Sequence, residues 1–219
     1  MALFFVLMLL TILHFLLFPQ EIVPPGTLRV GAYYIDQTEV LNIHWLEYIH
    51  FRSLEIPEAE HWRLLPAAEN DWYRIPERRH EPITHITYEQ AVDYCHWRTR
   101  VVQENFGFAV NFRLPTTVEW TTVAQTIYDQ HRKSVSKRLD RLKKRLKQNG
   151  PYYVSRRSHP KNKVVDLFVN VSEMTATKGI AKGGNHQNIL SEEILFTDVS
   201  YAGSHAFLGF RCIAEISPR

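Results

Sequence analysis

The spacing of hydrophobic and polar positions divides the chain into an apolar leader, a helical middle and a strand-rich end. Residues 1–18 contain no Asp, Glu, Lys or Arg. The loosely alternating, β-rich segment 28–35 predicts a strand. Thr38 then precedes a broad apolar face over 39–54, which predicts a first helix with Thr38 as its cap. Residues 57–82 show no sustained period and predict an irregular surface stretch.

Two capping boxes mark the next helices. The first is Thr-Tyr-Glu-Gln at 87–90, and the apolar positions that follow at helical spacing place Cys95 in mid-helix, on or near the buried face. The second is Thr-Thr-Val-Glu at 116–119. We expect its helix to run on through Arg132, because no Gly or Pro interrupts the chain before 149–150.

The last third of the chain changes character. Short strands are predicted over 164–171, 194–199 and 209–214, with a turn at 183–184. Helices followed by short strands, with much irregular chain between them, favour the α+β class.

Composition excludes several classes of protein. The chain has 219 residues, of which 45% are hydrophobic and 22% charged, with only 2 Cys. These values exclude collagen-like, disordered and disulfide-dense chains. A core of this size buries roughly 70% of the unfolded surface, so neither a metal nor a disulfide is needed merely to fold.

The apolar leader points to export. Its length is long for a signal-peptide core and just short of the ~20 residues that span a bilayer. We predict that 1–20 is a signal peptide or an N-terminal membrane anchor, that the domain occupies 26–219, and that the protein resides in the periplasm, on a membrane or at the cell surface. A buried N-terminal helix is the alternative, with only Thr11 and His14 available for a polar face.

Export would determine the oxidation state expected for the two cysteines. In an oxidising compartment, Cys95 and Cys212 would form one disulfide, whereas in the cytosol they would be two buried thiols.

The net charge of +3 hides an asymmetry. Residues 131–163 hold thirteen Lys and Arg against one acid, so the rest of the chain sums to −9. Leucines and a valine at steps of three and four predict a long basic helix with a narrow apolar stripe. Two interpretations of this basic helix are open. It lies on the surface of the domain and is solvated, or it docks on phospholipid, lipopolysaccharide or an acidic partner. No base-reading motif supports nucleic acid. The candidate contact residues are Lys137, Arg138, Arg141, Lys143, Lys144, Arg145 and Lys147.

Six blocks of residues carry a family resemblance. They are Tyr-Ile-Asp-x-Thr-Glu-Val-x-Asn at 34–42, Ile-Thr-Tyr-x-x-Ala-x-x-Tyr-Cys-x-Trp at 86–97, Arg-Leu-Pro-Thr-x-x-Glu-Trp at 113–120, Asn-Val-Ser-Glu-Met at 170–174, Lys-Gly-Gly-Asn at 182–185 and Gly-Phe-Arg-Cys at 209–212. In this order they resemble the sulfatase-modifying, formylglycine-generating enzyme domain. The resemblance implies an irregular α+β fold related to C-type lectins, into which a basic helix over about 129–163 is inserted. Among family members, the sequence is most similar to those of exported gliding-motility and type IX secretion proteins.

The resemblance also implies which residues matter. The family's structural disulfide corresponds to Cys95 and Cys212. Its active members bind copper(I) with two further cysteines, whose positions fall on about Asn188 and Glu193 here. Neither residue replaces a thiolate that soft copper(I) requires. We therefore expect a pseudoenzyme that needs no cofactor and acts as a binding or scaffolding component of the cell envelope. A divergent oxidase or metal-dependent enzyme is the alternative.

Two further sets of residues are candidate metal ligands. The family's structural calcium corresponds to Asp166, the Phe168 carbonyl and Asn170, oxygen ligands that suit Ca²⁺. Alternatively, Asp166 and Asn170 satisfy backbone amides in a turn. Eight histidines are scattered, and none forms a tight pair with a carboxylate: His44, His50, His61, His80, His85, His96, His186 and His205. His186 and His205 could approach one another if the terminal segments fold together, but for these two a polar surface role is predicted in preference to metal ligation.

Overall fold

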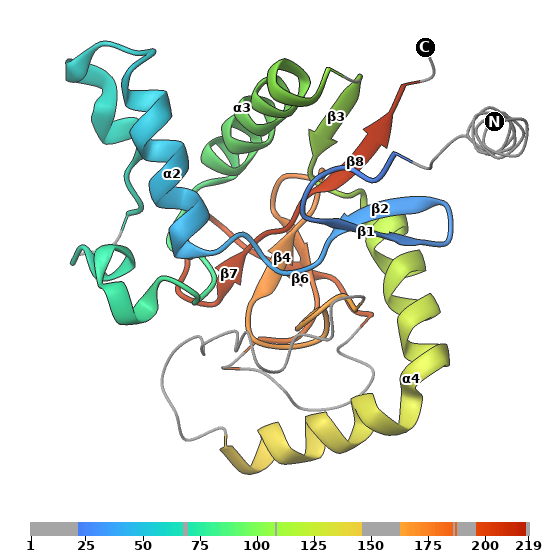
Figure 1. The fold of residues 1–219 in the computed structure, drawn as a ribbon. Helices are drawn as coiled ribbons and strands as arrows, with labels where there is room; N and C mark the ends of the chain where they lie inside the picture. Colours follow the sequence, from blue (N-terminus) through green and yellow to red (C-terminus); the bar gives the residue numbers. More distant parts are fainter. Residues whose placement is uncertain are drawn as a thin grey trace, which may run out of the picture.

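Two small sheets and three long helices form the body of the protein (Figure 1). The computed structural model describes residues 22–67, 70–107, 109–145, 163–185, 187 and 196–217, with the backbone alone at 134 and 138–145. The strands are β1 (Thr27–Val30), β2 (Tyr33–Asp36), β3 (Val110–Arg113), β4 (Ser172–Met174), β5 (Ile180–Lys182), β6 (Val199–Ser200), β7 (Leu208–Gly209) and β8 (Ile213–Ile216). The helices are α2 (Asn42–Ser53), α3 (Tyr88–Phe106), α4 (Thr117–Arg145) and the 3-10 helices η1 (Glu58–Leu64), η2 (Trp72–Arg74) and η3 (Pro76–Arg78).

The first sheet joins the two ends of the domain. Its order is β1-β2-β8-β3 and all its pairs are antiparallel. The C-terminal strand β8 lies between β2 and β3, so that Ala214 pairs with both Tyr34 and Phe112. The second sheet has the order β6-β5-β4-β7, with β4 and β7 parallel.

An aromatic cluster fills the space between α2, α3 and the C-terminal segment. Trp45 stacks on Tyr94 at 5.7 Å between ring centroids, and Phe210 meets Tyr94 edge to face at 5.4 Å. Tyr48 and Trp97 complete the cluster at 5.5 Å from one another. These large apolar rings supply much of the burial that holds the two helices to the sheet.

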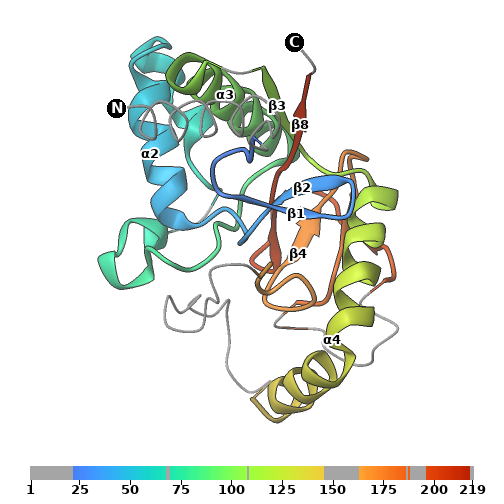
Figure 2. The same ribbon diagram turned by 45° about the vertical axis from the view of Figure 1, so that its right-hand side comes forward.

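Helix α4 joins the core to a protruding arm. Its first turns contribute Trp120, Val123 and Tyr128 to a second hydrophobic cluster. At His131 the backbone leaves helical geometry, with φ −131° and ψ 19°. Beyond this kink the helix continues to Arg145 along the lower edge of the molecule (Figure 2). The predicted continuation through Arg132 is therefore confirmed, while residues 146–162 of the predicted basic insertion lie outside the described residues.

The sequence-predicted caps have mixed outcomes. Thr87 Oγ1 accepts from the Gln90 amide at 3.2 Å, and Gln90 Oε1 accepts from the Thr87 amide at 2.8 Å, which confirms the first capping box. The reciprocal contacts of Thr116 with Glu119 confirm the second. The cap at Thr38 is wrong, because α2 begins three residues later behind Leu41.

Two predicted strands are also wrong. Segment 28–35 is a hairpin, because the chain reverses between β1 and β2 at Gly31, whose φ is +60°. Segment 164–171 is not a strand, since Asp166 and Asn170 have φ values of +57° and +84°, which an extended strand does not permit. The strand in this region starts at Ser172. Residues 194–195 lie outside the described part, and only Val199 of that predicted strand is extended.

Candidate functional site

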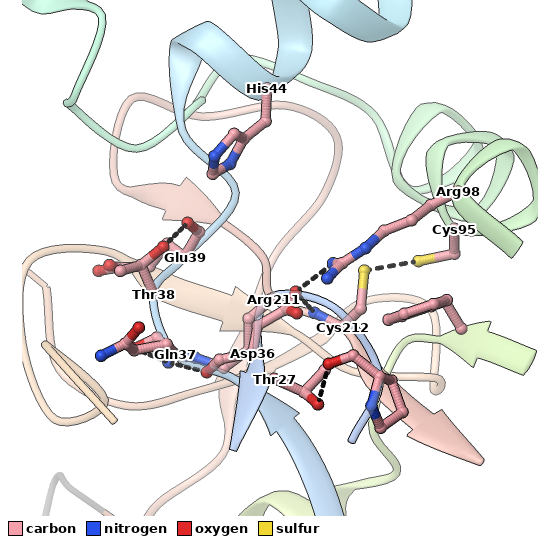
Figure 3. Close-up of polar contacts among 12 residues, drawn as sticks. Thr27, Asp36, Gln37, Thr38, Glu39, His44, Cys95, Arg98, Arg211 and Cys212 are labelled. Atoms are coloured by element: carbon pink, nitrogen blue, oxygen red, sulfur yellow. Dashed lines mark hydrogen bonds and ion pairs between the residues drawn. The ribbon is translucent and has the colours of Figure 1, made fainter. Parts of the chain in front are cut away.

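The thiol pair formed by Cys95 and Cys212 is the first feature of the site. Cys95 lies midway along α3, Cys212 directly before β8, and their Sγ atoms are 3.3 Å apart (Figure 3). Both residues are buried free thiols in the structure. Burial, and then the hydrogen bond with Cys95, raises the pKa of the Cys212 thiol well above its usual value. The pairing agrees with the sequence analysis, and the oxidised, disulfide-bonded state stays a prediction.

An ion pair between Asp36 and Arg98 lies beside the thiols. Asp36 Oδ2 accepts from Arg98 Nη1 and from the Cys212 amide, both at 2.8 Å (Figure 3). Arg98 Nη2 also donates to the Pro25 carbonyl at 2.8 Å. Burial alone would lower the pKa of Arg98, but the charge of Asp36, together with Cys212, Tyr94 and the hydrogen bond to Asp36, outweighs burial and raises the pKa of the guanidinium. These contacts tie the entry of the chain to β2, α3 and the C-terminal segment.

A second ion pair is completely buried. Arg211 and Glu173 are both 0% exposed, and Arg211 Nη2 lies 2.6 Å from Glu173 Oε1. Trp120 Nε1 donates to Glu173 Oε2 at 2.7 Å. Arg211 also donates to the Asp36 carbonyl at 3.0 Å and to the Val165 carbonyl at 2.9 Å. Such satisfied networks fix one arrangement of the surrounding chain.

Glu39 is a further buried carboxyl group. Its Oε1 accepts from Asn170 Nδ2 at 3.1 Å, while its Oε2, like Oδ1 of Asp36, has no hydrogen-bond partner among the described residues. Burial, and then the neighbouring charge of Asp166, raises the pKa of Glu39 well above its usual range. This environment favours the protonated carboxylic acid. We call the set of Asp36, Glu39, Arg98, Glu173 and Arg211 the ionic core.

Most residues of the ionic core lie within the family blocks, but their sequence positions alone do not predict a role for them. A signal was present: Glu39, Glu173 and Arg211 are charged residues inside apolar blocks, where an unpaired charge would be costly. Their partners were not visible, because the paired groups are far apart in the chain. Glu39 and Asn170, for example, are separated by 131 positions.

The predicted calcium ligands have other partners. The Phe168 carbonyl accepts from the Gly184 amide at 3.2 Å, and Asn170 donates its side-chain amide to Glu39. The backbone carbonyl of Asp166 accepts from the Val169 amide at 3.1 Å. Among the described residues, no group of three or more His, Cys, Asp and Glu side chains is placed to hold a metal. Calcium binding stays a prediction.

Two histidines are brought together. The His85 amide donates to the His205 carbonyl at 3.1 Å, and the His205 ring stacks on Phe207 at 4.7 Å. Burial, and then the charge of His205, lowers the pKa of His85. His44 lies inside the body instead, where its Nδ1 accepts from the Leu41 amide at 3.2 Å. Burial, and then Arg98, lowers the pKa of His44 to about 4.

The remaining predicted residues are on or beyond α4 and in the loop after β5. Lys137 is exposed on α4. Arg138, Arg141, Lys143, Lys144 and Arg145 follow it on the same helix, of which only the backbone is described. Lys147, His186, Asn188 and Glu193 lie outside the described residues.

Comparison with known proteins identifies the family. The model of the sulfatase-modifying factor enzyme 1-like domain matches residues 12–216, nearly the whole chain. The chain belongs to this family. This assignment confirms the predicted family and fold class, while the closer similarity to gliding-motility and type IX secretion proteins stays a prediction. That the basic helix is an insertion into the family fold stays a prediction.

Treponema denticola variable protein 1 is among the solved structures that match the chain. It is 13% identical, with a TM-score of 0.49, and the match covers 89% of each chain. A crystal structure of CarF is 16% identical with a TM-score of 0.49, and the match covers 88% of this chain and 96% of that one. None of the curated proteins matches the chain.

Proposed function

We propose that this member of the sulfatase-modifying factor enzyme 1-like family is an exported, non-catalytic domain that binds or scaffolds other components of the cell envelope. The observation that carries the proposal is the number and the position of the cysteines. The chain has two cysteines, and they face one another at 3.3 Å inside the body. No third cysteine is available for chemistry elsewhere in the chain.

The donor atoms do not fit copper(I). At the two positions that carry the thiols in active members, the chain has Asn188 and Glu193, which offer hard oxygen ligands. Cys95 and Cys212 are at most 1% exposed. The raised pKa of Cys212 also disfavours the thiolate that would bind the metal. Formylglycine formation is therefore not expected.

An oxidation assay tests this proposal. The full chain is incubated in air with copper and a cysteine-containing sulfatase peptide, beside an active family member as positive control, and the peptide is examined by mass spectrometry. We expect formylglycine only in the control. Product from this chain that disappears with Cys212→Ser would overturn the non-catalytic assignment. Stoichiometric copper or iron in the purified protein would instead support the divergent oxidase.

The basic part of α4 supports binding of an anionic component. Residues 131–163 carry a net charge of +12 against −9 for the rest, a separation that favours association with acidic partners. Lys137 exposes its side chain there. Retention on acidic vesicles, lipopolysaccharide and an acidic polypeptide is compared between the parent chain and Lys143→Glu with Lys144→Glu. We expect loss of retention on one of them.

A matched control reverses two charges elsewhere. Arg74 and Arg78, near η2 and η3, are 50% and 46% exposed and each pairs with an acid. Arg74→Glu with Arg78→Glu changes the net charge by the same amount without touching α4. Equal loss in both double variants would show a dependence on net charge alone and would contradict a binding surface on α4.

Membrane anchoring through residues 1–20 is the remaining part of the proposal. The described helices include none that is long and apolar enough to cross a bilayer. The anchor is tested by washing membranes of the native cells with alkaline carbonate, which releases peripheral proteins. Retention of the full chain supports the anchor, and release of a shortened mature form supports a cleaved signal peptide.

A further inference from the structure

The basic arm, residues 132–145 of α4, concentrates positive charge on one helix. It contains eight Lys and Arg and one acid, Asp140, so its net charge is +7. At a rise of 1.5 Å per residue the arm is about 21 Å long, with about one net charge for every 3 Å. In both views this half of α4 lies at the lower edge of the molecule, away from α2 and α3 (Figures 1 and 2).

The predicted apolar stripe of this helix begins on the side that faces the body. Val135, its first position, is half-buried and packs against the second hydrophobic cluster, which contains Tyr128 and Phe168. The guanidinium carbon of Arg132 lies 5.8 Å from the centroid of the Tyr128 ring. A helix that lies on a bilayer needs its apolar face for the lipid. The packing of Val135 therefore disfavours a lipid surface as the partner of the arm.

The body does not neutralise the described basic side chains of the arm. Arg132, Lys133 and Lys137 are exposed, and no carboxylate among the described residues pairs with them. Exposed arginines elsewhere do have such partners. Arg63, for example, pairs with Glu60 at 2.6 Å. The charges of the arm are therefore available to an external anion.

The basic positions surround most of the helix. Successive residues of an α-helix are about 100° apart, so positions 133 and 137 lie on one side of the arm and positions 138 and 145 about 110° further around it. Positions 132 and 143 lie about 110° away in the other direction. A flat anionic surface meets only one of these sides at a time. A flexible chain can follow the helix and contact all of them.

We infer that the basic arm binds a flexible, acid-rich polypeptide segment of another protein. This inference rests on the proposed binding of an anionic component and names the class of that component. An extended chain advances about 3.5 Å per residue, so about six consecutive residues span the arm. An acidic run of about that length nearly offsets the net charge of +7, and such runs are typically disordered interaction segments.

Fluorescence anisotropy of labelled oligoglutamates tests the inference. The full chain is titrated at low salt into peptides of about three, six and twelve glutamates, lengths chosen to cover half, all and twice the arm. We expect the affinity to rise about tenfold or more from the shortest to the middle peptide and less steeply beyond it. Binding should be lost near 1 M salt, where the Debye length falls to about 3 Å. Equal affinities for the two shorter peptides would contradict a segment that spans the arm.

Two double variants distinguish a flexible chain from a flat surface. Lys133→Glu with Lys137→Glu reverses one side of the arm, and Arg138→Glu with Arg145→Glu reverses another, with the same change in net charge. We expect each to weaken binding of the middle peptide about tenfold or more, while both keep the circular dichroism spectrum of the parent. Loss of binding in only one of the two would overturn the flexible segment and leave the arm as a one-sided binding surface.

Two other anions are measured on the same proteins. Vesicles of phosphatidylcholine with and without phosphatidylglycerol report a contact with acidic lipid, and alginate reports a contact with an acidic polysaccharide. Tighter charge-dependent binding of either than of the middle peptide would overturn the polypeptide partner while supporting an anionic-component surface on α4. Binding of none of the three anions would contradict that surface itself, and this inference with it.

Discussion

The ionic core and the basic arm, residues 132–145 of α4, contain the same kinds of charged residue, but the core buries them whereas the arm exposes Lys137. In the core, Arg211 is fully buried and its donors reach Glu173 and two backbone carbonyls. On the arm, Lys137 is exposed, and the segment around it contains one acid among thirteen basic residues. Charge in the core therefore determines which segments are held together, whereas charge on the arm remains available for a partner. The comparison predicts that core substitutions change stability and arm substitutions change binding.

The largest effect is expected at the buried ion pair. Arg211→Met removes the cation that faces the buried Glu173, and breaking a buried ion pair from one side should lower the free energy of unfolding by about 3–5 kcal/mol. Chemical denaturation followed by circular dichroism measures this loss. Lys178→Met is the matched control, because it breaks an ion pair with Glu89 in which both side chains are more than 60% exposed. A similar loss in both variants would contradict the distinction between core and surface charge.

The second-largest effect on stability is expected at the thiol pair of Cys95 and Cys212. After oxidation, Cys95 and Cys212 would close a loop of 117 positions, and such a bridge typically contributes about 2–5 kcal/mol. We expect that adding a thiol reductant to the oxidised protein lowers its denaturation midpoint. The double variant Cys95→Ser with Cys212→Ser should unfold at one midpoint with or without reductant. If the parent protein is equally insensitive after secretion, the cysteines are two thiols and the disulfide prediction is wrong.

Acid should lower the free energy of unfolding through protonation of His44. The folded protein keeps this side chain neutral, since burial and Arg98 lower its pKa from 6.5 to about 4. Below pH 6.5 the unfolded chain binds a proton that the folded chain does not, so stability falls as the pH drops toward 4. The expected contribution is at most about 3 kcal/mol. Measured from pH 7 to 4, His44→Gln should show a shallower loss than the parent, whereas parallel curves would assign the acid sensitivity to other groups.

Local signals in the sequence predicted some elements well. The caps at Thr87 and Thr116 depend on residues three positions apart, and both form as expected. The strand over 164–171 was wrong because β-prone side chains do not reveal that Asp166 and Asn170 adopt left-handed backbone angles. The hairpin was missed for the same reason, since the positive φ of Gly31 decides where the chain turns.

The site was predictable in its sulfur chemistry and not in its ionic contacts. Export and the family resemblance both indicated the pairing of Cys95 with Cys212, and the structure places them together. The contacts of Arg98 with Asp36 and Pro25 join segments 62 and 73 positions apart. No local period encodes such pairs. They come within hydrogen-bond distance because α3, which packs on β3, places Arg98 beside the end of β2.

The smallest change in stability, with a clear change in binding, is expected on the arm. Lys137→Glu alters an exposed side chain, so the free energy of unfolding should stay within about 0.5 kcal/mol of the parent. A basic residue near an anionic surface contributes about 1 kcal/mol, so the reversed charge should weaken binding of an acidic partner about fivefold or more. Denaturation and a salt titration of binding are measured on the same samples. Because Lys137 is described as exposed and Arg211 as buried, a loss of stability without a loss of binding at Lys137 would reverse the roles assigned to the two regions.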